Sequence, residues 1–142
     1  MNMSKIFEEQ WMDLQSGLIS LCLEAVGKPV DKVFAYASIE ENKKSFNAFF
    51  ESGGQILTLR QLGVPSSFIR RFLTEGVKDL GKLEALCNAS DRPCPFEMKM
   101  IYNAKTGSFD ADYQYESVCG ADKSITSAEV FRAWMDSMAP SQ

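Results

Sequence analysis

The fold is decided by the stretch from residue 32 to residue 59, KVFAYASIEENKKSFNAFFESGGQILTL. Three runs within it are rich in aromatic and aliphatic residues, as strands usually are: Lys32–Ile39, Ser45–Glu51 and Gln55–Leu59. The spacers between these runs are only a few residues long, whereas a parallel crossover needs a dozen or more. The stretch therefore predicts three antiparallel strands arranged as a meander.

Two more strands are predicted nearer the C-terminus, at residues Phe96–Asn103 and Ser108–Glu116, joined by the short segment AKTG. The second run alternates between an apolar and a polar series, which are Phe109, Ala111, Tyr113 and Tyr115 on one side and Asp110, Asp112, Gln114 and Glu116 on the other. Successive side chains of a strand point to opposite faces of the sheet. We therefore expect one face of this strand to be buried and the other to be acidic and wet.

Helical spacing of apolar residues predicts the remaining elements. A first helix starts with Ser4 as its N-cap and stops at Gly27. The central segment after Pro65 contains interior glycines, which predict two short helices or one kinked helix. A closing helix follows the capping residue Ser127, and Trp134 lies on its apolar face.

The expected order of elements is α-βββ-αα-ββ-α. This order describes an α+β domain in which an antiparallel sheet of about five strands packs with N-terminal, central and C-terminal helices. A length of 142 residues fits one domain, spanning residues 1–142. With 45% hydrophobic and 24% charged residues, the composition is that of an ordinary globular protein.

The balance of acidic and basic residues indicates which kind of partner the protein could bind. Fifteen Lys and Arg stand against 19 Asp and Glu, which gives a net charge of −4. Phosphate binding depends on clustered Lys and Arg, so this balance argues against direct binding of nucleic acid. An acidic protein is better suited to a basic protein partner.

The chain contains no histidine. The commonest general base near neutral pH, the Ser-His and Cys-His nucleophile pairs and every imidazole metal ligand are therefore missing. An enzyme built from this chain would depend on carboxylates, Lys, Tyr or Cys.

The four cysteines, Cys22, Cys87, Cys94 and Cys119, form no Cys-x-x-Cys pair and no zinc pattern. The N-terminal residues lack the pattern of a secretory signal, and no apolar run approaches the ~20 residues of a membrane span. We therefore expect a cytoplasmic protein with reduced and mostly buried thiols. Cys119 is expected to be the most exposed of them, since it precedes Gly120 in a predicted loop.

Three interpretations apply to Asp110, Asp112 and Glu116. Carboxylates on one strand face repeat every ~7 Å, and they could supply oxygen ligands to Mg²⁺ or Ca²⁺. Residues two apart on a flat strand spread rather than converge, however, so a solvated sheet face is favoured over a metal site. The third interpretation is an interaction surface that pairs with Arg and Lys of a basic partner.

The C-terminal hairpin also carries a resemblance to a known family. Residues 101–113, IYNAKTGSFDADY, are followed by Tyr-Glu at 115–116 and by the helix VFRAWM at 130–135. These residues, together with the leading helix and the Phe-rich hairpin SFNAFFESGGQIL at 45–57, resemble the YezG-like immunity protein family. The resemblance covers most of the chain loosely and the C-terminal part more tightly, while Asp91–Pro95 has no match.

The resemblance implies an antitoxin that neutralises a cognate polymorphic secreted toxin, typically a nuclease, by stoichiometric association. Such a protein is not an enzyme and needs neither cofactor nor metal. The implied partner is a basic nuclease domain, with no direct contact to nucleic acid or membrane, and a homodimer is left open. The residues expected to contact the partner are Asp110, Asp112, Gln114 and Glu116.

Two other functions stay open. A small acidic chaperone for a secreted effector would be similar in size, charge and fold class, and it would co-purify with an effector that remains active. A carboxylate-dependent metal-binding enzyme would bind Mg²⁺, Mn²⁺ or Ca²⁺ in a calorimetric titration.

Overall fold

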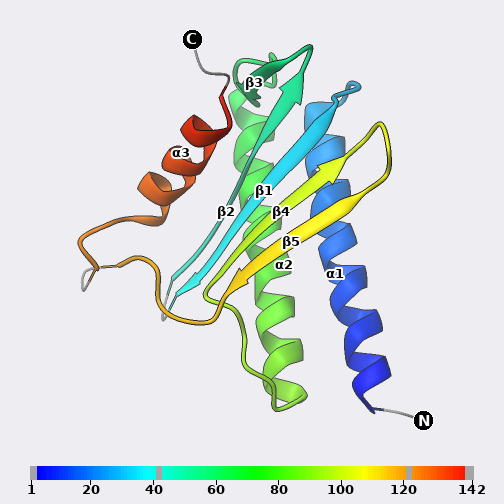
Figure 1. Ribbon diagram of the computed structural model, residues 1–142, viewed down its shortest axis with the longest axis vertical. Coiled ribbons are helices and arrows are strands. Elements are labelled where there is room, and N and C mark those ends of the chain that lie inside the picture. Colours follow the sequence, from blue (N-terminus) through cyan, green and yellow to red (C-terminus); the bar gives the residue numbers. More distant parts are fainter. Residues whose placement is uncertain (1–2, 41–42, 121–122, 140–142) are drawn as a thin grey trace.

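The computed structural model describes residues 3–40, 43–120 and 123–139, and this part of the chain contains three helices and five strands (Figure 1). The helices are α1 (Met3–Val26), α2 (Ser66–Ala89) and α3 (Ser127–Met138). The strands are β1 (Lys32–Glu40), β2 (Lys43–Ser52), β3 (Gln55–Thr58), β4 (Glu97–Asn103) and β5 (Phe109–Gln114). The expected α+β fold is confirmed.

The strands form one antiparallel sheet in the order β3-β2-β1-β4-β5. The predicted meander is confirmed, because β1 pairs with β2 and β2 pairs with β3. The C-terminal hairpin is added on the other side of β1, where β4 pairs with β1 and carries β5 on its far side. Strands β3 and β5 are therefore the two edges of the sheet.

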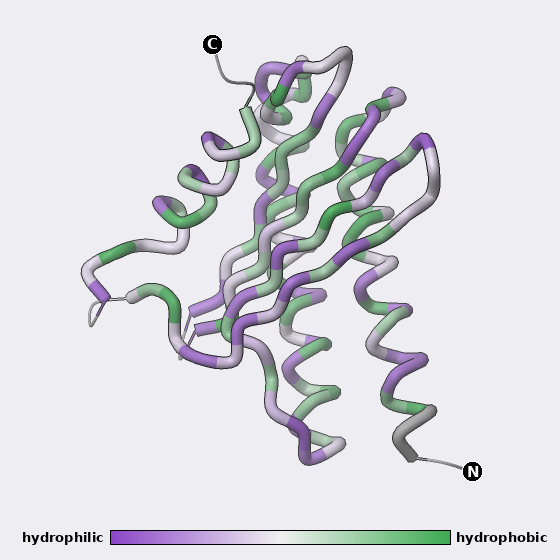
Figure 2. The backbone as a smooth tube through the Cα atoms, in the orientation of Figure 1, coloured by the Kyte–Doolittle hydropathy of each residue, from purple (hydrophilic) through white to green (hydrophobic). Residues whose placement is uncertain are grey.

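One face of the sheet, which we call the inner face, is covered by α1 and α2 (Figure 1). Hydrophilic and hydrophobic residues alternate along the strands (Figure 2), as a sheet with two different faces requires. The residues that the strands bury on the inner face include Val33, Ala35, Ala48, Phe50, Met98 and Met100.

The sequence predicted two short helices or one kinked helix in the segment after Pro65. The structure has a single helix there, α2. It passes so close to β2 that a Cβ added at Gly76 would lie 2.2 Å from a ring carbon of Phe46. Glycine costs about 1 kcal/mol in a helix interior. Here the missing side chain permits close packing on the sheet, and such packing is the main source of helix stability in proteins.

Helix α1 ends as predicted, since Gly27 follows it with φ +66° and donates its N–H to the Leu23 carbonyl at 3.1 Å. Its start is different: Ser4 lies within the helix, which begins at Met3, and is not its N-cap. Trp11 donates its indole N–H to the Tyr113 hydroxyl at 3.3 Å and so ties α1 to β5. Among the described residues, no helix is long and apolar enough to cross a bilayer.

Helix α3 packs on the opposite face, which we call the outer face, against residues of β1 and β2. Figure 1 shows α3 on the side of the sheet away from α1 and α2. Aromatic side chains fill this contact. The rings of Phe34 and Phe49 stack with their centroids 4.5 Å apart, and the Trp134 ring stands edge-on to Phe49 at 5.0 Å. Trp134 is 6% exposed, which confirms its predicted place in the core.

Helix α3 begins with a capping box. Its N-cap is Thr126 rather than the predicted Ser127, which is the first helical residue. The Thr126 side chain accepts the Glu129 N–H at 3.1 Å, and the Glu129 carboxylate accepts the Thr126 N–H at 3.1 Å. Both bonds satisfy backbone donors at a helix start, which explains why the helix begins here.

Strand β5 ends at Gln114, two residues before the predicted end at Glu116. The last bond to β5 runs from the Phe96 N–H to the Gln114 carbonyl at 2.7 Å, and the residues before Glu97 are not part of β4, so β5 has no strand to pair with beyond this point. The chain therefore leaves the sheet after Gln114. Tyr115, predicted to be buried, is 52% exposed, and Glu116 does not belong to the polar face of the strand.

Candidate partner-binding surface

The polar residues of β5 lie on the outer face, since Asp110 and Asp112 border the same groove as Trp134 of α3. The strand itself lies at the edge of the sheet, away from α3 (Figure 1). Asp110, Asp112 and Gln114 are exposed there, and we call these three residues the β5 row. The residues between them are partly buried against the inner core, namely Phe109, Ala111 and Tyr113. The structure thus places three of the four predicted contact residues in one row on an edge strand, and the fourth, Glu116, outside it.

A lysine that sequence reasoning missed stands beside the β5 row. Lys99 is the direct cross-strand neighbour of Asp112. Its ammonium lies 3.8 Å from a Glu97 carboxylate oxygen and 5.7 Å from the centre of the Trp134 ring. Within the described residues, neither Asp110 nor Asp112 forms an ion pair. Both carboxylates are therefore left to solvent or to a partner.

The carboxylate of Glu97 is buried beneath this surface, with the residue only 4% exposed. It accepts a hydrogen bond from the Tyr36 hydroxyl at 3.0 Å. Burial, followed by the Glu97 charge, raises the pKa of Tyr36 far above its usual value, so the hydroxyl keeps its proton and stays a donor. The alternation of FEMKMIYN placed Glu97 and Lys99 on one face, and that was the signal that could have found them.

An open groove of about 360 Å³ separates the β5 row from α3. It is lined by Lys99, Ile101, Asp110, Ala111, Asp112, Trp134 and Met138. Apolar side chains from β4 and α3 lie beside carboxylates from β5. This combination suits an Arg or Lys side chain, because its apolar stem can pack on apolar surface while its charged end meets the carboxylates.

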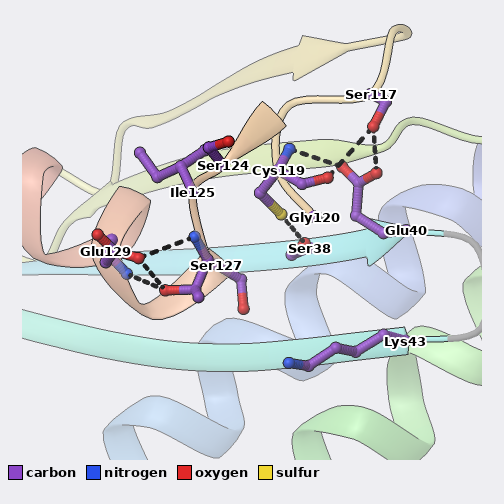
Figure 3. Close-up of a pocket in the computed structure, with 11 residues that line it drawn as sticks. Ser38, Glu40, Lys43, Ser117, Cys119, Gly120, Ser124, Ile125, Ser127 and Glu129 are labelled. Atoms are coloured by element: carbon purple, nitrogen blue, oxygen red, sulfur yellow. Dashed lines mark hydrogen bonds between the residues drawn. The ribbon is translucent and has the colours of Figure 1, made fainter. Parts of the chain in front are cut away.

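A larger hollow of about 620 Å³ lies where the end of β1 and the start of β2 meet the start of α3 (Figure 3). The carboxylate of Glu40 reaches into this region and accepts N–H bonds from Val118 at 3.0 Å and Cys119 at 3.4 Å, besides the Ser117 hydroxyl. Burial alone would raise the pKa of Glu40, but these donors outweigh it and lower the pKa. Glu40 therefore fastens residues 117–119 to the end of β1.

The prediction that Cys119 is the most exposed thiol is wrong. The residue is 7% exposed, because the Glu40 contacts hold its backbone against β1 and its sulfur lies 3.6 Å from the Ser38 hydroxyl oxygen. Burial raises the pKa of the Cys119 thiol. All four cysteines are free, and only Cys94 is more than slightly exposed, in line with the expected buried thiols.

Within the described ranges, no three His, Cys, Asp or Glu side chains come together as metal ligands. Asp110 and Asp112 project from alternate positions of β5, so they are spaced along a strand instead of facing a common centre.

The chain matches no protein-family model and no curated protein sequence. Membership of the YezG-like immunity family therefore stays a prediction from the sequence.

Proposed function

We propose that this protein is an immunity protein, which binds a secreted toxin with a basic surface and blocks it by stoichiometric association. The observation that carries the proposal is the β5 row. Its two carboxylates are exposed, have no ion pair among the described residues and stand beside a groove with apolar walls. The sequence resemblance to YezG-like immunity proteins supports the same function.

The charge of the row fits the class of toxin. A nuclease holds phosphates with clustered Lys and Arg, so its substrate cleft is basic. Carboxylates on a binding protein speed its encounter with such a basic cleft. They also repel acidic proteins, which disfavours binding to the wrong partner. Bound across the cleft, the β5 row would occupy the place of the phosphates and exclude the nucleic acid.

The rigidity of the surface favours binding without rearrangement. β5 is hydrogen-bonded along β4, and Tyr113 is anchored to α1 through the Trp11 indole and through the side chain of Gln15, whose amide oxygen accepts the Tyr113 hydroxyl at 2.6 Å. Gln15 itself is fully buried. A preorganised strand loses less backbone conformational entropy on binding, which benefits affinity.

The test is expression with the toxin encoded by the neighbouring gene. Cells that carry this protein should survive the toxin, and the purified pair should form a complex that blocks toxin activity and weakens as salt is raised. A neighbouring product that is no more toxic in the absence of this protein would contradict the proposal. A stable complex in which the partner keeps its activity would instead identify a chaperone.

A further inference from the structure

Strand β5 is an edge strand, and within the described part of the chain no other strand pairs with its outer edge. β5 has six residues and pairs with β4 on one side only. The opposite edge of the sheet belongs to β3, which has four residues. A free strand edge offers unpaired N–H and C=O groups to another extended chain.

The register shows which backbone groups of β5 are free. The Asn103 N–H donates to the Ser108 carbonyl at 2.9 Å, so this pair is hydrogen-bonded across the hairpin. In an antiparallel ladder the bonded positions recur at every second residue. Asp110 and Asp112 therefore bond to β4, whereas the N–H and C=O groups of Phe109, Ala111 and Tyr113 point to the open edge.

The charges on β5 argue against a second copy of this chain as the occupant. An antiparallel pairing of two β5 strands centred on Ala111 would set Asp110 of one copy directly opposite Asp112 of the other, twice. Like charges directly opposite each other destabilise a strand pair. A strand with Lys or Arg at these positions would instead be attracted.

We propose that an extended basic segment of the partner pairs with the open edge of β5 and becomes a sixth strand of the sheet. In this segment, Lys or Arg would alternate with apolar residues. The basic side chains would lie beside the β5 row on the outer face, and the apolar ones beside Phe109, Ala111 and Tyr113. This inference rests on the proposed function and specifies how the toxin is held.

The probe for this mode is a short acetylated peptide that alternates valine and arginine, with a valine and glutamate peptide as its control. Amide hydrogen exchange of the labelled protein is followed by NMR. The arginine peptide should slow exchange at Phe109, Ala111 and Tyr113, while Asp110 and Asp112, already bonded to β4, should change little. No slowing at about 1 mM peptide, or equal slowing by both peptides, would overturn the inference.

The same readout in the toxin complex separates this inference from the proposed function. Alternate protection along β5 supports strand addition. A complex that forms and neutralises the toxin without protecting Phe109, Ala111 and Tyr113 overturns strand addition and leaves the immunity function standing. Failure to bind the toxin, with the peptide result intact, overturns the immunity function alone.

A matched pair of variants adds an energetic test. Ala111→Pro removes one N–H from the open edge, where the fold does not use it, and Ala111→Val keeps that N–H. Ala111→Pro should weaken binding of the toxin and the peptide about tenfold relative to Ala111→Val, with thermal unfolding as the check of folding. Equal binding by the two folded variants would contradict a backbone-paired edge.

Discussion

The outer face of the sheet has two halves: α3 covers one of them, and the other is exposed and carries the carboxylates of β5. One cross-strand row passes through both halves, from Phe49 and Phe34 to Ile101 and then Asp110. Its first part lies under α3 and is aromatic, and its last part is a free carboxylate on the edge strand. Helix α3 thus divides a single sheet face into a part that stabilises the fold and a part that remains open for contact.

Removing the main anchor of the covered half should have the largest effect. Trp134→Ala deletes the ring that packs on Phe49 and lies near the Lys99 ammonium, so the variant should lose about 3–5 kcal/mol of unfolding free energy. Denaturant unfolding measures the loss. Met138→Ala, at a 40% exposed position on the same helix, is the control and should change little. Equal losses in the two variants would refute the division between the halves.

The boundary between the halves contains the buried Tyr36 and Glu97 pair. Tyr36→Phe removes the hydroxyl that donates to the Glu97 carboxylate and leaves a buried acceptor with fewer partners. The unfolding free energy should fall by about 1–3 kcal/mol. The control is Tyr115→Phe, at an exposed position without a hydrogen bond of its side chain among the described residues, and it should be neutral. A neutral Tyr36→Phe would show that the pair does not contribute.

A smaller, pH-dependent effect is expected at Glu40, which holds the segment leading toward α3. Its pKa is lowered in the folded protein, so the folded state binds the proton less readily than the unfolded state. The stabilisation that the ionised Glu40 gives the folded protein is fully present above the pKa of Glu in the unfolded chain. It is lost as the pH falls through the lowered pKa of the folded state. The midpoint temperature of thermal unfolding should therefore change less between neutral and acidic pH in Glu40→Gln than in the wild type. Parallel curves would contradict this role.

The local features of the fold could be predicted from the sequence, and the contacts between distant segments could not. Alternation along residues 109–114 set the faces of β5 correctly, because that pattern is a local consequence of strand geometry. The end of β5 depends on its partner β4, which begins only at Glu97, and no pattern within residues 109–116 reports where the partner strand begins. Cys119 was misplaced for the same reason, since its burial depends on contacts with Ser38 and Glu40 on β1.

The candidate site shows the same limit. The carboxylates of the β5 row were recognised from their own strand. Lys99 was not, because its relation to Asp112 depends on the register between β4 and β5, and its position near Trp134 depends on where α3 docks. Sheet order and helix docking are set by long-range packing, which a single sequence does not display.

The most direct test of the account compares two double variants with the same change in net charge. Asp110→Asn with Asp112→Asn removes the open half's carboxylates, and Glu8→Gln with Glu9→Gln removes two exposed carboxylates from α1, on the opposite side of the sheet. Neither should shift the unfolding free energy by more than about 0.5 kcal/mol. Calorimetric titration with the toxin should show affinity about tenfold weaker for the β5 variant alone, with a reduced dependence on salt. Equal affinities for the two variants would contradict the claim that the β5 row binds the partner.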